Sequence, residues 1–259
     1  MSHYTIIIFL ILIIYMSVWF VFSLIKKRND LADIAWGLGF VLVTWTSLLF
    51  AGIISQRSIL ASLLVTFWGL RLSWHIFQRN KEKSEDYRYL AFRKRWDRLF
   101  YLRSYFQIYL LQGVFLFVIS FPVLVINKIL GPPLGVIDFI GLTLWLVGFS
   151  IEAVSDAQLT GFKKNPFNKN KIMQSGLWKY SRHPNYFGEV ALWWGIWIIS
   201  LSVVNGFFTI ISPLTITILI LKVTGVPMLE KRMSKNPDFI DYKKRTSVFI
   251  PLPPKRNIS

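Results

Sequence analysis

The side chains best suited to bind a charged ligand are concentrated in residues 176–195, which read GLWKYSRHPNYFGEVALWWG. Pro184 biases the residue before it away from helical backbone. The segment therefore predicts a structured turn at 181–186 that leads into a helix starting near Tyr186 or Phe187.

Positive charge surrounds this turn. The N-terminus of a helix presents free N–H groups and favours anions, and Arg182 and His183 add cationic donors beside it. Four more charges lie just upstream, at Lys163, Lys164, Lys169 and Lys171. Together they predict a phosphate-binding pocket, although a basic loop lying on anionic lipid head groups would have the same composition. The presence of Asn185 and Glu189 favours the pocket, because attraction to lipid requires neither.

Other ionisable side chains lie inside or beside apolar segments, where such groups are costly and are usually functional or paired. Arg71 and His75 share one helical face by their spacing, which suits either interhelical hydrogen bonds or the lining of a site. Glu152 and Asp156 have the same spacing, and like charges so placed repel. We expect one of these two carboxyl groups to be protonated, or each to face a different donor.

Several kinds of chemistry are excluded by composition. The chain has no cysteine and only three scattered histidines, which excludes disulfides and thiolate nucleophiles and argues against a metal site. The GxGxxG fingerprint of soluble dinucleotide-binding folds is absent.

Apolar segments must position these residues. The 259 residues are 54% hydrophobic and 17% charged, with a mean hydropathy of +0.47, whereas soluble domains carry about 25% charged residues. A membrane-spanning helix needs about 20 apolar residues, and the chain has seven such segments: 5–25, 34–54, 58–77, 105–126, 136–154, 187–204 and 207–226. We therefore expect an all-α, polytopic membrane protein with about seven transmembrane helices. The sixth segment is short and carries Glu189, so a partly embedded or broken helix is an alternative there.

The distribution of lysine and arginine predicts the orientation. Of the 30 basic residues, 26 lie in the alternate segments 26–33, 78–104, 155–186 and 227–259. The other connections, 55–57, 127–135 and 205–206, hold only Arg57 and Lys128. Basic residues favour the cytoplasmic side, so the N-terminus is expected outside and the C-terminus inside. This orientation accounts for most of the net charge of +17 without a nucleic-acid partner.

The motif SRHPNYFGE at 181–189, followed by WWG at 193–195, closely resembles the C-terminal signature of the steroid 5-alpha-reductase and sterol reductase superfamily. The likeness is greatest to a bacterial branch once known only as a domain of unknown function. It extends over about 151–251, and a weaker likeness covers WGLRL at 68–72 and EDYRY at 85–89.

This resemblance implies a single integral-membrane domain of 1–259 that binds NADPH at the cytoplasmic face of a bacterial inner membrane. Its N-terminal helices, 1–126, would form the substrate half, and 136–259 the cofactor half. The cofactor-binding residues implied are Asp156, Lys163, Lys171, Arg182, His183, Asn185, Tyr186, Glu189, Glu230 and Tyr242.

The implied reaction is hydride transfer to a carbon–carbon double bond of a lipophilic, steroid-, sterol- or isoprenoid-like substrate that enters from the bilayer. Steroid 5-alpha-reductases bind the substrate ketone with a Glu on the second helix and a Tyr further on, but segment 34–54 has no carboxylate and only Asp33 at its edge. Tyr87 or His75 is predicted as proton donor, with Arg71 or Arg88 as orienting charge. Besides this substrate and membrane lipids, no obligate partner is predicted.

Two alternatives remain open. Isoprenylcysteine carboxyl methyltransferases and bacterial phospholipid methyltransferases, which use S-adenosylmethionine, look similar around Arg182–Pro184 and from Glu230 to Tyr242. Asp156 together with Asn185, Glu189 and the tryptophan pair favours reduction. A transporter or channel is disfavoured, because neither internal repeats nor paired broken helices are visible.

Overall fold

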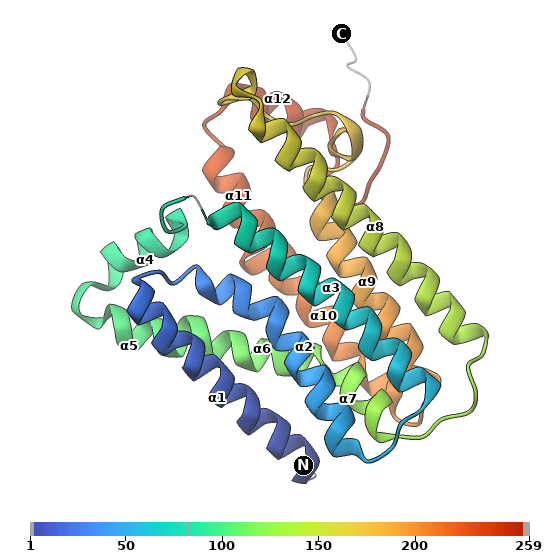
Figure 1. Cartoon of the computed structure of the whole chain (residues 1–259). Helices are drawn as coiled ribbons and strands as arrows, with labels where there is room; N and C mark the ends of the chain where they lie inside the picture. The colour runs from blue at the N-terminus through green and yellow to red at the C-terminus, as the bar shows by residue number, and fades with distance from the viewer. Residues whose placement is uncertain (1–2, 82, 256–259) are drawn as a thin grey trace. The chain divides into compact units, whose positions relative to one another are not determined.

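The structure is a computed structural model that describes residues 3–81 and 83–255 (Figure 1). The described residues form helices and turns, with no strand among them. The chain divides into two compact units: one runs to Gly135 and adds Ser200–Ser212, and the other combines Val136–Ile199 with the residues from Pro213 onward.

The first unit opens with three long consecutive helices. They are α1 (His3–Lys26), α2 (Leu31–Ala51) and α3 (Gln56–Asn80). Gly52 ends α2 with a positive φ of 71°, a conformation that glycine adopts without strain. Ser55 caps α3 by accepting from the backbone N–H of Ser58, whose hydroxyl accepts in return from the Ser55 N–H.

The rest of the first unit is a chain of shorter helices. They are α4 (Tyr87–Trp96), α5 (Phe100–Ser104), a π-helical turn (Tyr105–Leu110), α6 (Leu111–Ile119) and α7 (Phe121–Lys128). The single helix predicted at 105–126 is thus interrupted at Ser120. Pro122, near the start of α7, lacks the N–H that an uninterrupted helix would use.

The second unit is built on two helices packed through glycine. These are α8 (Val136–Lys164) and α9 (Pro184–Ser200), which lie side by side in Figure 1. A Cβ on Gly148 would lie 2.7 Å from the carbonyl oxygen of Gly188, and one on Gly141 would lie 2.7 Å from that of Gly195. Glycine at these positions lets the two backbones approach closely.

Shorter elements complete this unit. They are α10 (Ile211–Ile218), whose first two residues belong to the first unit, a π-helical turn (Leu219–Val223), α11 (Gly225–Met233) and α12 (Pro237–Arg245).

Six helical stretches of the described chain are long and apolar enough to cross a membrane. They are His3–Lys26, Leu31–Ala51, Gln56–Asn80, Tyr87–Ile119, Val136–Lys164 and Gly206–Met233. The all-α class is confirmed, and the chain is an integral membrane protein. The count of seven and the orientation stay predictions, because α9 has only 17 residues and Ser2, at the predicted outer end, lies outside the described residues.

Candidate functional site

The turn before α9 is ordered by its own backbone and by one serine. Helix α9 begins at Pro184, two residues before the predicted start, because proline fits the first helical position. The His183 N–H donates to the Ser181 hydroxyl at 3.1 Å, and the His183 carbonyl accepts from the Phe187 N–H at 3.1 Å.

The C-terminal segment 247–252 is hydrogen-bonded to this turn. Ser181 forms an isolated bridge with Ser247, and its hydroxyl donates to the Phe249 carbonyl at 2.7 Å. The N–H of Leu252 donates to the Tyr180 carbonyl at 3.0 Å. The C-terminal end of the likeness, which extends to about residue 251, therefore corresponds to a segment that is bonded to the turn.

Arg182 is buried and fully engaged. Its guanidinium donates to Glu230 at 2.8 Å and to the carbonyl oxygen of Thr246 at 2.5 Å. Glu230 lies 3.2 Å from the Lys243 ammonium and 3.4 Å from Nε2 of His183. These contacts connect the turn to α11 and to the end of α12, so in this geometry Arg182 and Glu230 position the turn.

Tyr242 has a similar structural role. Its hydroxyl donates to the carbonyl oxygens of Trp178 and Ser181, and burial raises the pKa of the phenol above its usual value. The indole N–H of Trp178 donates to the Ser155 carbonyl at 3.1 Å, which fixes the same segment on α8.

Asp156 and Asn185 form a hydrogen-bonded pair between α8 and α9. Nδ2 of Asn185 donates to Oδ1 of Asp156 at 3.2 Å, which fixes the orientation of the amide. The other amide atom, Oδ1 of Asn185, is buried and accepts no hydrogen bond. A buried acceptor without a donor is unfavourable, so this atom is suited to an N–H from a bound molecule.

The other predicted cofactor residues of this unit differ in their burial. The Tyr186 ring stacks on His183 with centroids 5.7 Å apart, and Glu189 is half-buried one turn further along α9. Lys163, in the last turn of α8, and Lys171, in the connection that follows, are exposed.

In the first unit, Asp33 is the centre of a second polar cluster. Helix α2 begins at Leu31, so Asp33 lies in its first turn. The carboxylate accepts from Arg88 at 2.5 Å and from the Tyr89 hydroxyl at 2.7 Å. Asp86 caps α4 and also binds Arg88; although burial opposes its ionisation, the Arg88 guanidinium holds the pKa of Asp86 below its usual value.

Sequence reasoning missed Tyr89. Tyr87, the predicted proton donor, is the first residue of α4, whereas the phenol that bonds Asp33 comes two residues later. Both residues belong to EDYRY, and nothing in that motif selects one tyrosine. Arg71 and His75 lie one turn apart on α3, both half-buried, and their predicted roles stay predictions.

Residues 19–246 match a family described as a protein of unknown function, DUF1295. The chain belongs to this family. It is 27% identical over 164 residues to an uncharacterized protein of Schizosaccharomyces pombe, covering 54% of this chain and 47% of that protein. It is 40% identical over 78 residues to 3-oxo-5-alpha-steroid 4-dehydrogenase 1 of Rattus norvegicus, covering 29% and 30%. It is also 38% identical over 69 residues to a steroid 5-alpha-reductase of Gossypium hirsutum, covering 26% and 27%.

These alignments span about half or less of each relative's length. They confirm the resemblance at the level of the steroid 5-alpha-reductase superfamily. The bacterial branch stays a prediction.

Proposed function

We propose that this chain is a membrane-embedded reductase that uses NADPH to reduce a carbon–carbon double bond of a lipophilic, steroid-, sterol- or isoprenoid-like substrate. The observation that supports it best is the Asp156–Asn185 pair, whose amide is oriented and whose buried Oδ1 has no donor. The pair belongs to a chain with relatives named as 5-alpha-steroid dehydrogenases and reductases.

The residues of the second unit fit the cofactor. Asn185 would accept from the carboxamide of the nicotinamide, and Lys163 and Lys171 would hold phosphate groups by charge-assisted hydrogen bonds. When bound, NADPH supplies the hydride. Arg182, Glu230 and Tyr242 hold the turn in place, since their polar atoms bond within the protein.

On the substrate side we propose that Asp33 and Tyr89 form the site for the carbonyl oxygen of the substrate. The Tyr89 phenol would donate its proton to a ketone oxygen as negative charge develops there, and the Asp33 carboxylate would orient the phenol. Arg88, also bonded to Asp33, would set the charge of the pair. This assignment supplies the carboxylate that segment 34–54 lacks. His75 and Tyr87 remain the donors predicted from sequence.

Ligand binding to the purified protein tests the proposal. NADPH should bind about tenfold or more tightly than NADH, because a charged hydrogen bond to the 2′-phosphate is worth about 1.5–3 kcal/mol. Lys171→Gln should reduce this preference, while Lys179→Gln, an exposed lysine beside Tyr180, should leave it intact. Binding of S-adenosylmethionine but not NADPH would instead support a methyltransferase.

A further inference from the structure

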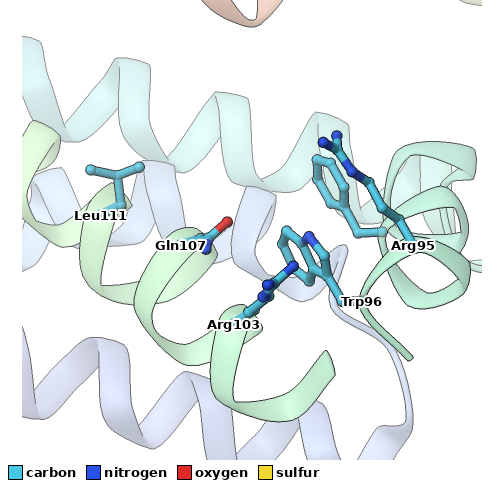
Figure 2. Close-up of a pocket in the computed structure, with 6 residues that line it drawn as sticks. Arg95, Trp96, Arg103, Gln107 and Leu111 are labelled. Atoms are coloured by element: carbon cyan, nitrogen blue, oxygen red, sulfur yellow. The ribbon is translucent and has the colours of Figure 1, made fainter. Parts of the chain in front are cut away.

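A groove in the first unit is lined by none of the residues of the polar clusters described above. It has a volume of about 540 Å³ and is lined by Phe92, Arg95, Trp96, Arg103, Gln107 and Leu111 (Figure 2). The chain turns sharply between α4 and α5 at Asp97, which has a positive φ of 42°. This turn brings the end of α4 to the same groove as residues that follow in α5 and α6.

The two arginines of the groove form no ion pair within the part of the chain that the structure describes. Among the described residues, neither the Arg95 nor the Arg103 guanidinium makes a hydrogen bond or an ion pair. Arg93, in the same helix as Arg95, is by contrast engaged: it lies 3.2 Å from Glu85 and over the ring of Phe100. The groove therefore presents two planar guanidinium groups to a ligand.

The remainder of the groove is apolar. Phe92 and Trp96 stack with their ring centroids 4.7 Å apart and an interplanar angle of 3°. Arg103, Gln107 and Leu111 follow one another at intervals of four residues along the helix, and Figure 2 shows Gln107 and Leu111 successively further from the arginines. The π-helical turn at Tyr105–Leu110 widens the helix there and keeps these side chains in one row.

The surface beside this row is apolar too. Leu102 and Phe106, next in sequence to Arg103 and Gln107, are 58% and 55% exposed. Both belong to a stretch that is apolar enough to cross a membrane. The groove thus has a cationic end and an apolar end, and the apolar end continues into a surface suited to hydrocarbon.

We propose that this groove binds a lipid phosphate, with the head group held by Arg95 and Arg103 and the hydrocarbon chain directed along Gln107 toward Leu111. Guanidinium groups match phosphate oxygens through paired hydrogen bonds. The aromatic pair Phe92–Trp96 would cover the first carbons of the chain. This site is independent of the proposed reductase activity.

Native mass spectrometry of the full chain in an uncharged detergent tests the site, with phosphatidylglycerol and phosphatidylcholine as probes. Wild-type protein should hold one phosphatidylglycerol in preference to phosphatidylcholine. Arg95→Gln/Arg103→Gln should weaken that binding about tenfold or more. Lys94→Gln/Arg98→Gln removes the same charge from exposed positions of the same segment outside the groove and should leave the binding unchanged.

Three outcomes would overturn the proposal. Equal losses in both double variants would mean diffuse attraction to surface charge, and equal binding of both lipids would mean that the head-group charge is not recognised. In a competition experiment, dodecyl phosphate should displace the bound phosphatidylglycerol more effectively than inorganic phosphate does. Equal displacement by the two would mean that the site binds free anions. Leu111→Asn, at an exposed position, keeps both arginines and adds no charge. It should weaken binding of dodecyl phosphate but not of inorganic phosphate, and it provides the test if the arginine variant fails to fold.

Discussion

The two polar atoms of the Asn185 side chain have different surroundings. The side-chain N–H of Asn185 donates to Asp156 at 3.2 Å, while the buried side-chain oxygen accepts no hydrogen bond. A helix cap alone would explain an asparagine near the start of α9, but α9 begins at Pro184, so Asn185 is already inside the first turn. Capping therefore does not account for this asparagine, and its buried oxygen still lacks a donor.

An exchange of the Asn185 and Asp156 side chains separates a structural role of the pair from a role in binding. Asn185→Asp alone places two carboxylates within hydrogen-bond distance and should lower both thermal stability and NADPH affinity, because like charges in a partly buried site repel. The double variant Asn185→Asp/Asp156→Asn restores an amide–carboxylate hydrogen bond, with the amide now on α8 and the carboxylate on α9. We expect the melting temperature to recover while NADPH affinity, measured by calorimetry, stays about tenfold weaker, because the negative charge has moved from α8 to α9. Full recovery of affinity together with stability would make the pair purely structural.

Tyr89 and Tyr87 offer a matched pair for the proton donor. Of these two tyrosines, Tyr89 is the one whose hydroxyl donates to Asp33, at 2.7 Å. Tyr89→Phe should lower kcat for a lipophilic 3-oxo enone about a hundredfold or more, the usual scale of general-acid catalysis, without changing NADPH affinity. Tyr87→Phe should have a small effect. The opposite pattern would assign the donor to Tyr87, as predicted from sequence.

At the scale of elements, the packing of α8 against α9 positions Asp156 beside Asn185. Glycine occurs seven residues apart on each helix, at 141 and 148 and at 188 and 195, and each lies against the other helix's backbone. Such spacing repeats on one helical face, so the close contact runs along both helices.

Gly188→Ala tests this contact. The added Cβ would lie 2.5 Å from the Gly148 carbonyl oxygen and 2.6 Å from the Glu152 nitrogen, and neither backbone atom can move without shifting a helix. We expect a loss of about 1–3 kcal/mol in stability, seen as a lower melting temperature in detergent, together with weaker NADPH binding. Gly161→Ala on α8 is the control, since a Cβ there meets no atom within 4 Å, and it should stabilise the helix by about 0.5–1 kcal/mol. Equal melting temperatures for Gly188→Ala and wild type would show that the helices separate easily at this point.

Hydropathy predicts the long helices well because a membrane-spanning helix requires a long run of apolar residues. The segment expected at 5–25 is α1, and that expected at 58–77 lies within α3. Hydropathy does not show where a helix breaks, so the interruption at Ser120 was missed. Contacts that depend on the rotation of a helix, such as the choice of Tyr89 over Tyr87, could not be read from spacing, and the partners of Arg182 depend on segments about fifty residues or more away in sequence.

At the scale of the whole molecule, charge asymmetry is the basis of the predicted orientation. The two basic residues of the predicted outer connections are engaged: Arg57 donates to the carbonyl oxygens of Pro132 and Pro133, and Lys128 lies over the ring of Tyr4. Their local contacts explain why these two residues can occur on the side that otherwise lacks positive charge.

Cysteine labelling tests this orientation and the number of crossings together, since the chain has no native cysteine. Arg57 is only 3% exposed, so a cysteine there would be shielded from reagent on either side; Gln56 is exposed and adjacent. In intact cells, a membrane-impermeant maleimide should label Gln56→Cys but not Lys169→Cys, which should react only after lysis.

Val204→Cys, at a residue 70% exposed after α9, decides whether α9 crosses. A helix of 17 residues spans about 25 Å, less than the roughly 30 Å of the bilayer core, but exposed residues beyond Ser200 can complete the crossing. If α9 crosses, Val204→Cys should be labelled in intact cells, as Gln56→Cys is. If Val204→Cys is labelled only after lysis, as Lys169→Cys is, the count falls to six and α9 is embedded from one side.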